Sequence, residues 1–387
     1  MTGTRKTVLF VDHATALGGA EHSLLLLLKH LDRTRVQPHL AAVEGPLARQ
    51  ARALGIPVHP APLPRLRGSP TWFWDGMQGV MSLARLAREV GADVLYGNTV
   101  RASVYTAAAA RLVRRDFIWH MRDFWLSETE PRFVTVDRWG KRALCAAATH
   151  VIANSRATAQ HLPCPGRVTV IYNGVELSLY DPRMDGLPFR QAHSIPRDAA
   201  VVGMVGRLRP WKGQKVFLRV LAAVQATHPD VWGVIVGGTP FGVEDAYPQE
   251  LRALAHTLGV ADRVVFTGHL EDVRPALAAM DLLVHPGDPE PFGRVVIEAM
   301  AMARPVVAFA QGALPEILRH GQTGFLVQPG NEEEMVAHIL RLLRNPEQTR
   351  RMGEEARRHV EARFTAERTA REVEALLLGD GRRTDRA

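Results

Sequence analysis

Two basic residues, Arg207 and Lys212, follow a short apolar stretch in the segment VVGMVGRLRPWKG. The apolar stretch predicts a buried strand, and the glycines at 206 and 213 allow a close approach of the backbone. Two fixed cations at this spacing suit a diphosphate, because arginine makes bidentate contacts and lysine acts as a point charge. The P-loop pattern G-x-x-x-x-G-K-[ST] is absent, and a pair of ordinary exposed cations is the alternative interpretation.

Two carboxylates, Glu290 and Glu298, lie in the segment PEPFGRVVIEAMAM. The helix predicted here begins near Gly293, Arg294 and Val295, whose free N–H groups suit a phosphate or sugar oxygen. Glu298 lies about one turn further along, where it suits vicinal ribose hydroxyls, and Glu290 suits the hydroxyls of an adjoining sugar. The alternative is one loop carboxylate and one surface carboxylate, although the apolar neighbours of Glu298 disfavour its exposure.

Short β-rich runs alternate with longer helical patterns along most of the chain, which is typical of parallel α/β domains. Strands are predicted at 7–11, 39–43, 58–60, 93–96, 117–120, 151–153 and 168–171, then at 200–205, 232–236, 264–267, 282–285, 305–309 and 325–327. Helices are predicted at 21–30, 46–54, 77–90, 103–113 and 138–148, then at 212–228, 249–258, 273–280 and 294–303. From residue 332 the chain is almost entirely helical, with breaks near Pro346 and Phe364.

The pattern predicts two doubly wound domains in tandem, over residues 1–178 and 179–363. Residues 364–378 form a last helix, and 379–387 a polar tail that we expect to be disordered. Open parallel sheets bind ligands outside the carboxyl ends of their strands, where this sequence places glycines, cations and carboxylates. Two such surfaces that face each other predict one polar cleft.

Composition excludes several classes of protein. The 387 residues are 46% hydrophobic and 23% charged, which suits globular domains. No run approaches the length of a membrane span, and the first residues lack the apolar core of a secretory signal. The two cysteines, Cys145 and Cys164, are predicted to be reduced thiols in a cytoplasmic protein, and no Cys/His cluster has zinc-ligand spacing.

The net charge of +8 is uneven along the chain. Residues 1–180 contain 22 basic and 13 acidic side chains, so the whole excess lies in the first half. Such asymmetry indicates an anionic partner, such as a nucleic acid or a membrane surface, or else only aids solubility. Nucleic-acid binding is disfavoured because no recognition module is present.

A proline-rich segment, residues 56–74, ends in Trp72, Phe73 and Trp74 and also contains Arg65 and Arg67. Prolines stiffen such a segment into an extended form. The aromatic residues suit a lipid head-group boundary or a sugar acceptor. The alternative, which we favour from sequence, is that the two tryptophans seat the next helix on the sheet.

The chain resembles the retaining glycosyltransferases of family 4, two-domain GT-B enzymes that use nucleotide sugars. Glu290 and Glu298 match the family's E-x7-E pair. Further matches occur in order along the chain, at Gly18-Gly19-Ala20-Glu21, VIYNGV (170–175), Gly206-Arg207 with Lys212-Gly213, FTGH (266–269), ALPEI (313–317) and GQTGFL (321–326). The resemblance covers most of the chain, is densest over residues 166–330, and is weaker from 57 to 150.

The resemblance implies a role for each matched residue. Arg207 and Lys212 stabilise the diphosphate leaving group, Glu298 binds the ribose, and Glu290 binds the donor sugar. The resemblance further implies that His120 lies beside the reacting carbon. It also implies contacts with the donor at Gly18, Gly19, Gly293, Arg294, Val295 and His269. The family also implies that the last helix packs on the first domain.

The implied reaction transfers a sugar from a UDP- or GDP-sugar to a carbohydrate or lipid-linked acceptor and keeps the anomeric configuration. Because D-x-D, the metal signature of the other main glycosyltransferase fold, is absent, we expect neither a metal nor another cofactor. The basic first half suggests an anionic or membrane-attached acceptor, and therefore a cytoplasmic enzyme with peripheral contact at the inner face of the membrane.

Three other functions stay open at this point. A sugar-nucleotide 2-epimerase shares the two-domain architecture, although the E-x7-E pair favours a transferase. A Rossmann NAD-dependent enzyme is disfavoured because the first strand is followed by ALGGAE rather than G-x-G-x-x-G. A non-catalytic binding subunit is disfavoured by the complete set of Arg207, Lys212, Glu290 and Glu298.

Overall fold

The computed structural model describes residues 5–64, 71–125, 134–239 and 246–379. The chain divides into two compact units, Met1–Gly174 with Ala366–Ala387, and Val175–Thr365. The first unit thus ends at Gly174 rather than at the predicted residue 178, and it takes in the last helix. Of the predicted tail, residues 380–387 lie outside the described residues.

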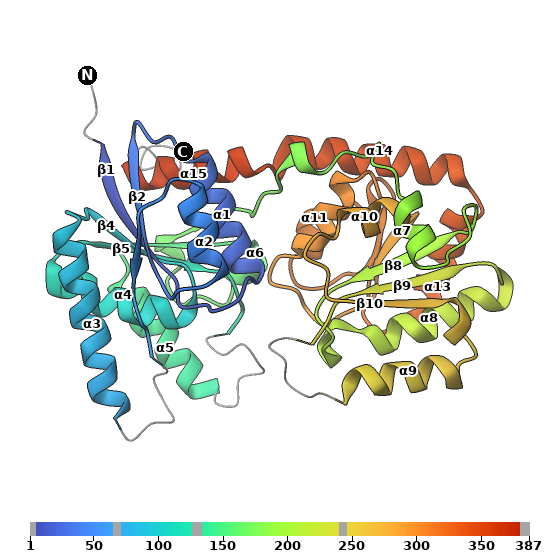
Figure 1. Cartoon of the computed structure of the whole chain (residues 1–387), viewed down its shortest axis with the longest axis horizontal. Coiled ribbons are helices and arrows are strands. Elements are labelled where there is room, and N and C mark those ends of the chain that lie inside the picture. Colours follow the sequence, from blue (N-terminus) through green and yellow to red (C-terminus); the bar gives the residue numbers. More distant parts are fainter. Residues whose placement is uncertain (1–4, 65–70, 126–133, 240–245, 380–387) are drawn as a thin grey trace. The chain divides into compact units, whose positions relative to one another are not determined.

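The first unit contains a seven-stranded sheet in the order β3-β2-β1-β4-β5-β6-β7 (Figure 1). The strands are β1 (Lys6–Val11), β2 (Val36–Ala42), β3 (Val58–Pro60), β4 (Val94–Gly97), β5 (Asp116–Met121), β6 (His150–Ala153) and β7 (Val168–Val170). All neighbours pair in parallel. The order reverses between β1 and β4, which is where such sheets bind ligands.

Helices cover both faces of this sheet because its side chains alternate between the faces. Val8 and Phe10 join one buried cluster, whereas Leu9 and Val11 join the other. The first cluster includes residues of α1 (Gly19–His30), α2 (Pro46–Ala53) and α15 (Ala366–Leu378); the second includes residues of α3 (Trp72–Glu89), α4 (Val100–Val113) and α5 (Val134–Ala147). A short helix, α6 (Arg156–Ala159), follows β6.

Helix α15 packs on α1 of the first unit, although more than 300 residues separate them in sequence. Its residues Ala370, Val373 and Leu377 are buried in the same cluster as Leu24 and Leu28. Polar contacts reinforce this packing, since Lys6 Nζ donates to the Leu377 carbonyl at 2.8 Å.

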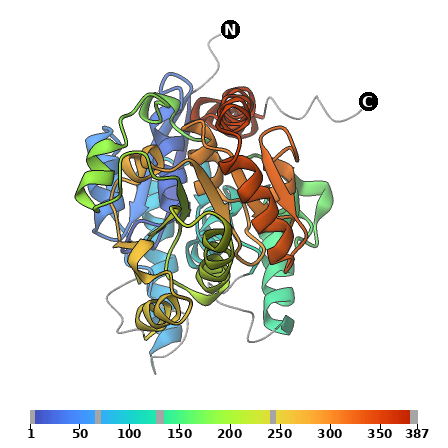
Figure 2. The ribbon, with the colours of Figure 1, turned by 90° about the vertical axis from the view of Figure 1, so that its right-hand side faces the viewer.

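The second unit contains a six-stranded parallel sheet in the order β10-β9-β8-β11-β12-β13. Its strands are β8 (Val201–Val205), β9 (Trp232–Val236), β10 (Val264–Gly268), β11 (Leu282–His285), β12 (Val306–Phe309) and β13 (Gly324–Val327). Its helices are α7 (Leu187–Ala192), α8 (Gln214–Thr227), α9 (Tyr247–Thr257), α10 (Arg274–Ala279), α11 (Arg294–Ala301), α12 (Leu314–Ile317), α13 (Glu332–Leu343) and α14 (Pro346–Arg363). This unit faces the viewer in Figure 2, with α9 in yellow. Its strand order reverses between β8 and β11.

The alternation of strands and helices predicted from sequence is confirmed. The helices differ from the prediction at several places, among them the unpredicted short helices α6 and α12. Helix α3 begins at Trp72, five residues before the predicted start, and α7 lies in a connection that was predicted without a helix. A six-residue helix is too short to produce a periodic signal, and α7 buries only Phe189. None of the described helices has the length and hydropathy that crossing a membrane requires.

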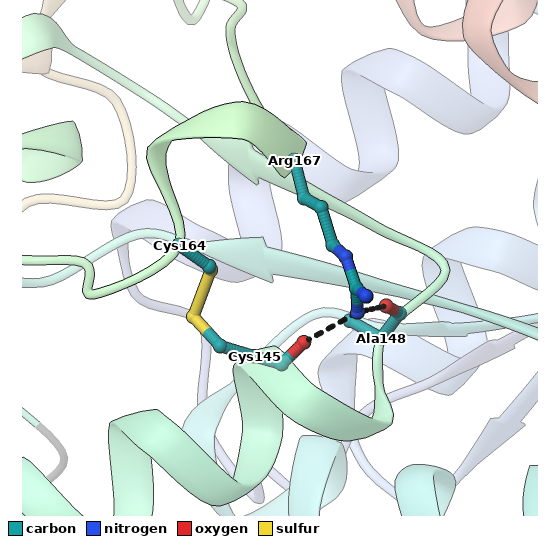
Figure 3. Close-up of a disulfide and its surroundings, with 4 residues drawn as sticks. All are labelled: Cys145, Ala148, Cys164 and Arg167. Atoms are coloured by element: carbon teal, nitrogen blue, oxygen red, sulfur yellow. Dashed lines mark hydrogen bonds between the residues drawn. A yellow bond between two sulfur atoms is a disulfide. The ribbon is translucent and has the colours of Figure 1, made fainter.

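The prediction of two reduced thiols is wrong, because Cys145 and Cys164 form a disulfide (Figure 3). It joins α5 to the turn before β7, with 6.0 Å between the two Cα atoms. Arg167 donates to the carbonyls of Cys145 and Ala148, both at 3.3 Å, and so holds the same two segments together. The sequence shows two cysteines 19 positions apart but not that the fold brings them within bonding distance.

Reduction of this disulfide is expected to destabilise the first unit. A cross-link over a loop of this length contributes about 3 kcal/mol by restricting the unfolded chain. Dithiothreitol should therefore lower the thermal midpoint of the first unit by roughly 5 to 10 °C, as measured by circular dichroism or scanning calorimetry. The double variant Cys145→Ser/Cys164→Ser serves as control, since its midpoint should be low and indifferent to reductant. A wild-type midpoint that ignores reductant would contradict the disulfide.

Candidate active site

The predicted donor residues of the second unit gather where its strand order reverses. Strands β8 and β11 are hydrogen-bonded neighbours, although about 80 residues lie between them. Arg207 and Lys212 follow β8, and Glu290 follows β11. The two strand ends therefore deliver cations and a carboxylate to the same place.

Close backbone packing locks the two loops together. Gly213 has a φ of +81°, and a Cβ there would lie 2.3 Å from the Pro286 carbonyl oxygen, so only glycine fits. The amide of Asp288 donates to the Trp211 carbonyl at 2.7 Å. These contacts hold the single turn Pro210–Lys212 against the loop that carries Glu290.

Lys212 and Glu290 form an ion pair, with 2.6 Å between Nζ and Oε2. Both side chains are mostly buried, at 19% and 21% exposed. Burial by itself raises the pKa of Glu290, but Lys212 and the nearby His285 outweigh it, so the pKa lies below its ordinary value. Burial lowers the pKa of His285, whose Nε2 lies 3.8 Å from the Glu290 carboxylate. The site therefore holds Glu290 ionised against a cation.

Arg207 is exposed, and its guanidinium has no hydrogen bond or ion pair within the described part of the chain. Its main chain is fixed, since Gln214 donates to the Arg207 carbonyl at 2.8 Å. It also lowers the pKa of Glu290 through its charge, which places it near that carboxylate. Arg207 is thus a cation near Lys212 and Glu290 that is available to an anion.

Glu298 lies on α11 and is buried, as its apolar neighbours indicated. Its Oε1 accepts from Arg294 Nη2 at 2.7 Å, one turn earlier on the same helix. Gly293, which precedes α11, has a φ of +93° and lies against the Glu290 side chain. Gly293, Arg294 and Val295 form the first turn, whose N–H groups lack partners within a helix.

His269 lies apart from this group, after β10 and exposed to solvent. The Gly237-Gly238 turn after β9 packs against it, since a Cβ at Gly238 would meet the His269 Cβ at 3.1 Å. That turn also contacts the end of β8, because Leu208 donates to the Gly238 carbonyl at 3.0 Å. Three neighbouring strand ends thus form a continuous edge, but no contact joins His269 to Lys212 or Glu290 in the described residues.

In the first unit, Gly18 and Gly19 begin α1. The Gly18 amide donates to Glu21 Oε2 at 2.7 Å, so Glu21 closes the loop onto the helix. Burial raises the pKa of Glu21 to about 7, and the nearby Asp12 adds to this effect. Asp12 is buried as well, and burial raises its pKa.

His120 is buried near the end of β5, with its Nδ1 hydrogen-bonded to the Tyr96 hydroxyl of the neighbouring strand β4. Its Nε2 is buried and has no hydrogen-bond partner among the described residues. Burial, and then the charge of Arg122, hold the pKa of His120 well below its ordinary value, so the ring is neutral. A neutral histidine with one unsatisfied ring nitrogen is available to an incoming polar atom.

A polar network at the same sheet edge was missed as a site from sequence. Asn98 donates to Asp12 at 2.7 Å and accepts from Arg122 at 2.8 Å, and Arg122 also donates to Asn173 at 2.8 Å. These residues follow four different strands, and all are partly or fully buried. Their position directly after predicted strands was the only available signal, because sequence does not show which strands are neighbours.

The favoured interpretation of the proline-rich segment is wrong for Trp74, which is 66% exposed and does not seat α3 on the sheet. Leu83, Ala84 and Ala87 on the other side of the helix make that contact. Arg65, Arg67 and the side chain of Trp72 lie outside the described residues.

Comparison with known proteins decides which family combines these features. The model of the Glycosyltransferase Family 4 matches residues 17–179, and that of Glycosyl transferases group 1 matches residues 187–359. A lipopolysaccharide core biosynthesis mannosyltransferase, LpcC of Rhizobium leguminosarum, is 32% identical over 259 residues, which are 66% of this chain and 71% of LpcC. The chain belongs to glycosyltransferase family 4.

Other relatives agree with this assignment. The D-inositol 3-phosphate glycosyltransferase of Streptomyces avermitilis is 36% identical over 57% of this chain, which spans half of that relative. The structure of Anabaena HepE in complex with UDP and glucose superimposes with a TM-score of 0.82 and 30% identity, over 96% of this chain and 98% of HepE. Sucrose-phosphate synthase of Thermosynechococcus elongatus, at 21% identity and a TM-score of 0.81, shares the fold.

The predicted fold class is therefore confirmed as the α/β GT-B type with two Rossmann-like units. This family 4 chain is a glycosyltransferase, and the comparisons do not support the epimerase alternative.

Ionisation of Glu21 is expected to cost stability as the pH rises. Its folded pKa of about 7 lies above the ordinary value of 4.5, so stability is complete below about pH 4.5 and is lost as the pH rises through 7. Glu21→Gln keeps the acceptor for the Gly18 amide but does not ionise. Between pH 4.5 and 7.5, the variant should gain about 3 kcal/mol of unfolding free energy relative to the wild type, as measured by urea denaturation.

Glu44→Gln is the control for this measurement. Arg52 lowers the pKa of Glu44, so the wild type should gain stability relative to that variant as the pH rises through the acid range. A difference between wild type and Glu21→Gln that does not change with pH would contradict the raised pKa.

Proposed function

We propose that this glycosyltransferase transfers a sugar from a UDP- or GDP-sugar to a carbohydrate or lipid-linked acceptor with retention of the anomeric configuration, in glycan, polysaccharide or glycolipid synthesis. The observation that carries the proposal is the Lys212–Glu290 ion pair, with Arg207 beside it, at the strand reversal of the second unit. HepE binds UDP and glucose in its crystal structure, and its similarity over nearly the whole chain supports a UDP-sugar in particular.

The chemistry follows from where charge develops. When the bond between the anomeric carbon and the diphosphate breaks, positive charge grows on the sugar and negative charge grows on the diphosphate. Arg207 and Lys212 stabilise the diphosphate, assisted by the first turn of α11. The acceptor oxygen bonds to the anomeric carbon from the leaving-group face, and its proton passes to a diphosphate oxygen.

Glu290 and Glu298 bind hydroxyls in this proposal. Glu290 is ionised. Its carboxylate oxygens can accept hydrogen bonds from hydroxyls of the donor sugar when Lys212 turns toward the diphosphate. Glu298 accepts from the ribose hydroxyls, and its present partner Arg294 keeps the carboxylate oriented. His269 lines the same sheet edge, on the far side of Arg207.

In the first unit, we propose that Gly18, Gly19 and His120 contact the donor. The Tyr96 hydroxyl is buried, and its one hydrogen-bond partner in the described residues is His120 Nδ1, so the hydroxyl proton must point to that nitrogen. Nδ1 is then the acceptor, and the ring proton lies on Nε2. His120 is thereby set to donate a hydrogen bond from Nε2 to an oxygen of the donor sugar.

The basic excess of residues 1–180 supports an anionic or membrane-linked acceptor, with peripheral contact between the first unit and an anionic membrane. The relative LpcC is named for lipopolysaccharide core biosynthesis, which agrees with a lipid-linked acceptor. No role for nucleic acid is proposed.

Removal of Lys212 or Glu298 should abolish transfer. Lys212→Ala removes the cation nearest the leaving group, and we expect kcat/KM to fall by about 100-fold or more. Glu298→Ala removes the proposed ribose acceptor and should raise KM for the donor. Sugar release or transfer from a radiolabelled nucleotide sugar measures both. Circular dichroism checks that each variant is folded.

Lys215→Ala is the matched control, because Lys215 is an exposed lysine three positions away whose ion pair is with Glu250. Its activity should stay within about twofold of the wild type. Near-normal kcat/KM for the donor in Lys212→Ala or Glu298→Ala would overturn the assignment of the site.

A thermal-shift screen of nucleotides and nucleotide sugars identifies the donor. A ligand at 100 times its Kd stabilises the folded state by about 2.7 kcal/mol, so UDP and UDP-sugars should raise the midpoint while NAD should not. We expect no metal requirement, and both the shift and the transfer activity should persist in EDTA. Loss of either in EDTA, with recovery on addition of Mg²⁺ or Mn²⁺, would contradict metal independence.

A further inference from the structure

We infer that the N-terminal ends of α3 and α5 form a lipid-docking surface that seats the first unit on an anionic bilayer. The docking surface consists of exposed apolar side chains from both helices: Phe73, Trp74, Met77 and Met81 on α3, and Val134, Val136 and Trp139 on α5. The inference deepens the proposed membrane contact by naming the residues that make it.

These side chains are unusual in being large, apolar and exposed together. Of the eleven large apolar side chains exposed in the described part of the chain, seven belong to the docking surface. Trp74 is 66% exposed and Trp139 is 63% exposed. Scattered single exposed apolar residues are normal, whereas their concentration at the starts of two helices indicates an interaction surface.

Poor packing does not explain the exposure, because α3 is well seated by its opposite face. Leu83, Ala84 and Ala87 are buried against the sheet. The exposed face changes character along the helix, from apolar residues at 73–81 to Arg85 and Arg88 near its end. At 1.5 Å per residue, the apolar part is about 12 Å long, which is close to the depth of a bilayer interface.

The two helix ends lie at the same edge of the first unit. Both helices cover the same face of the sheet, and each runs back from the carboxyl edge of the parallel strands. Figures 1 and 2 both show α3 and α5 reaching the lower edge of this unit. A flat partner can therefore contact both ends at once.

Charge selects an anionic lipid surface as that partner. The first nine residues of α3, α4 and α5 together contain four basic and two acidic residues. One of the acids, Asp137, is buried in an ion pair with Lys141. Arg142 lies over the Trp139 ring at 5.5 Å, so a cation accompanies the exposed aromatic. Tryptophan with arginine at the polar–apolar boundary suits the head-group region of a bilayer.

The position also suits the proposed acceptor. Gly18, His120 and the polar network around Arg122 lie at the carboxyl edge of the same sheet. A bilayer at this edge would present a lipid-linked acceptor to the side of the first unit where transfer is proposed. Membrane binding can be measured without any transfer, so its failure and the failure of the proposed function are distinguishable.

Vesicle flotation of the full chain tests the inference. Wild type should float with vesicles of 30% phosphatidylglycerol in phosphatidylcholine. With vesicles of phosphatidylcholine alone, it should stay in the bottom fraction of the gradient. In the double variant Trp74→Ser/Trp139→Ser, the partition coefficient onto the anionic vesicles should fall about tenfold or more, because each substitution removes a large apolar contact with the bilayer. Arg138 is an exposed residue of α5 next to Trp139, and Arg138→Glu should weaken binding and reduce its dependence on salt.

Two matched controls separate this surface from exposed apolar residues in general. Leu112→Ser changes a residue at the opposite end of α4, and Leu179→Ser changes one in the second unit; both should bind as wild type. Unchanged flotation of the tryptophan double variant would overturn the inference, as would equal binding of wild type to neutral vesicles.

Occupants other than lipid are outcomes of the same set of variants. Gel filtration with light scattering tests for self-association. If wild type self-associates, the double variant is monomeric and neither binds vesicles, then a second copy of the chain covers the surface. The inference fails in that case. Absence of both vesicle binding and self-association by wild type would also overturn it.

Discussion

The adjacency of β8 and β11 is the constraint on which the proposed donor site depends. A parallel sheet requires a crossover between neighbouring strands, and here the crossovers bring together two strand ends separated by about 80 residues. Lys212 and Glu290 meet because of this topology. The close backbone contact between Gly213 and Pro286 fixes the two loops against each other. Each charge compensates the desolvation of the other, so a cation and a carboxylate are held ready in a largely buried place.

The first unit uses the same topology with different chemistry. Its strand order reverses between β1 and β4, and there the structure gathers Asp12, Asn98 and Arg122 into a hydrogen-bonded network around the start of α1. Burial raises the pKa values of Asp12 and Glu21 and lowers that of His120, so the edge is rich in groups whose charge is suppressed. Such groups suit hydrogen bonding to hydroxyls, whereas the second unit presents full cations that suit phosphate.

The uneven charge of the chain gains a physical interpretation from the side chains. The excess of positive charge lies in the unit that also exposes Trp74 and Trp139, and the near-neutral unit contains the proposed diphosphate site. This division matches the proposed function, in which the second unit binds the donor and the first unit meets the acceptor. The disulfide at Cys145 further ties α5, which carries three of the seven residues of the proposed docking surface, to the body of the first unit.

The sequence by itself determined the fold class and the order of strands and helices along most of the chain, and it singled out Arg207, Lys212, Glu290 and Glu298 as candidate site residues, because hydrophobic periodicity and spaced motifs are local signals. Tertiary structure alone decided which strands are neighbours, and with them the Lys212–Glu290 pair, the Tyr96–His120 hydrogen bond and the Cys145–Cys164 bond. It also decided that Trp74 faces solvent. Contacts of this kind depend on the three-dimensional path of the chain between distant segments, and local sequence does not encode that path.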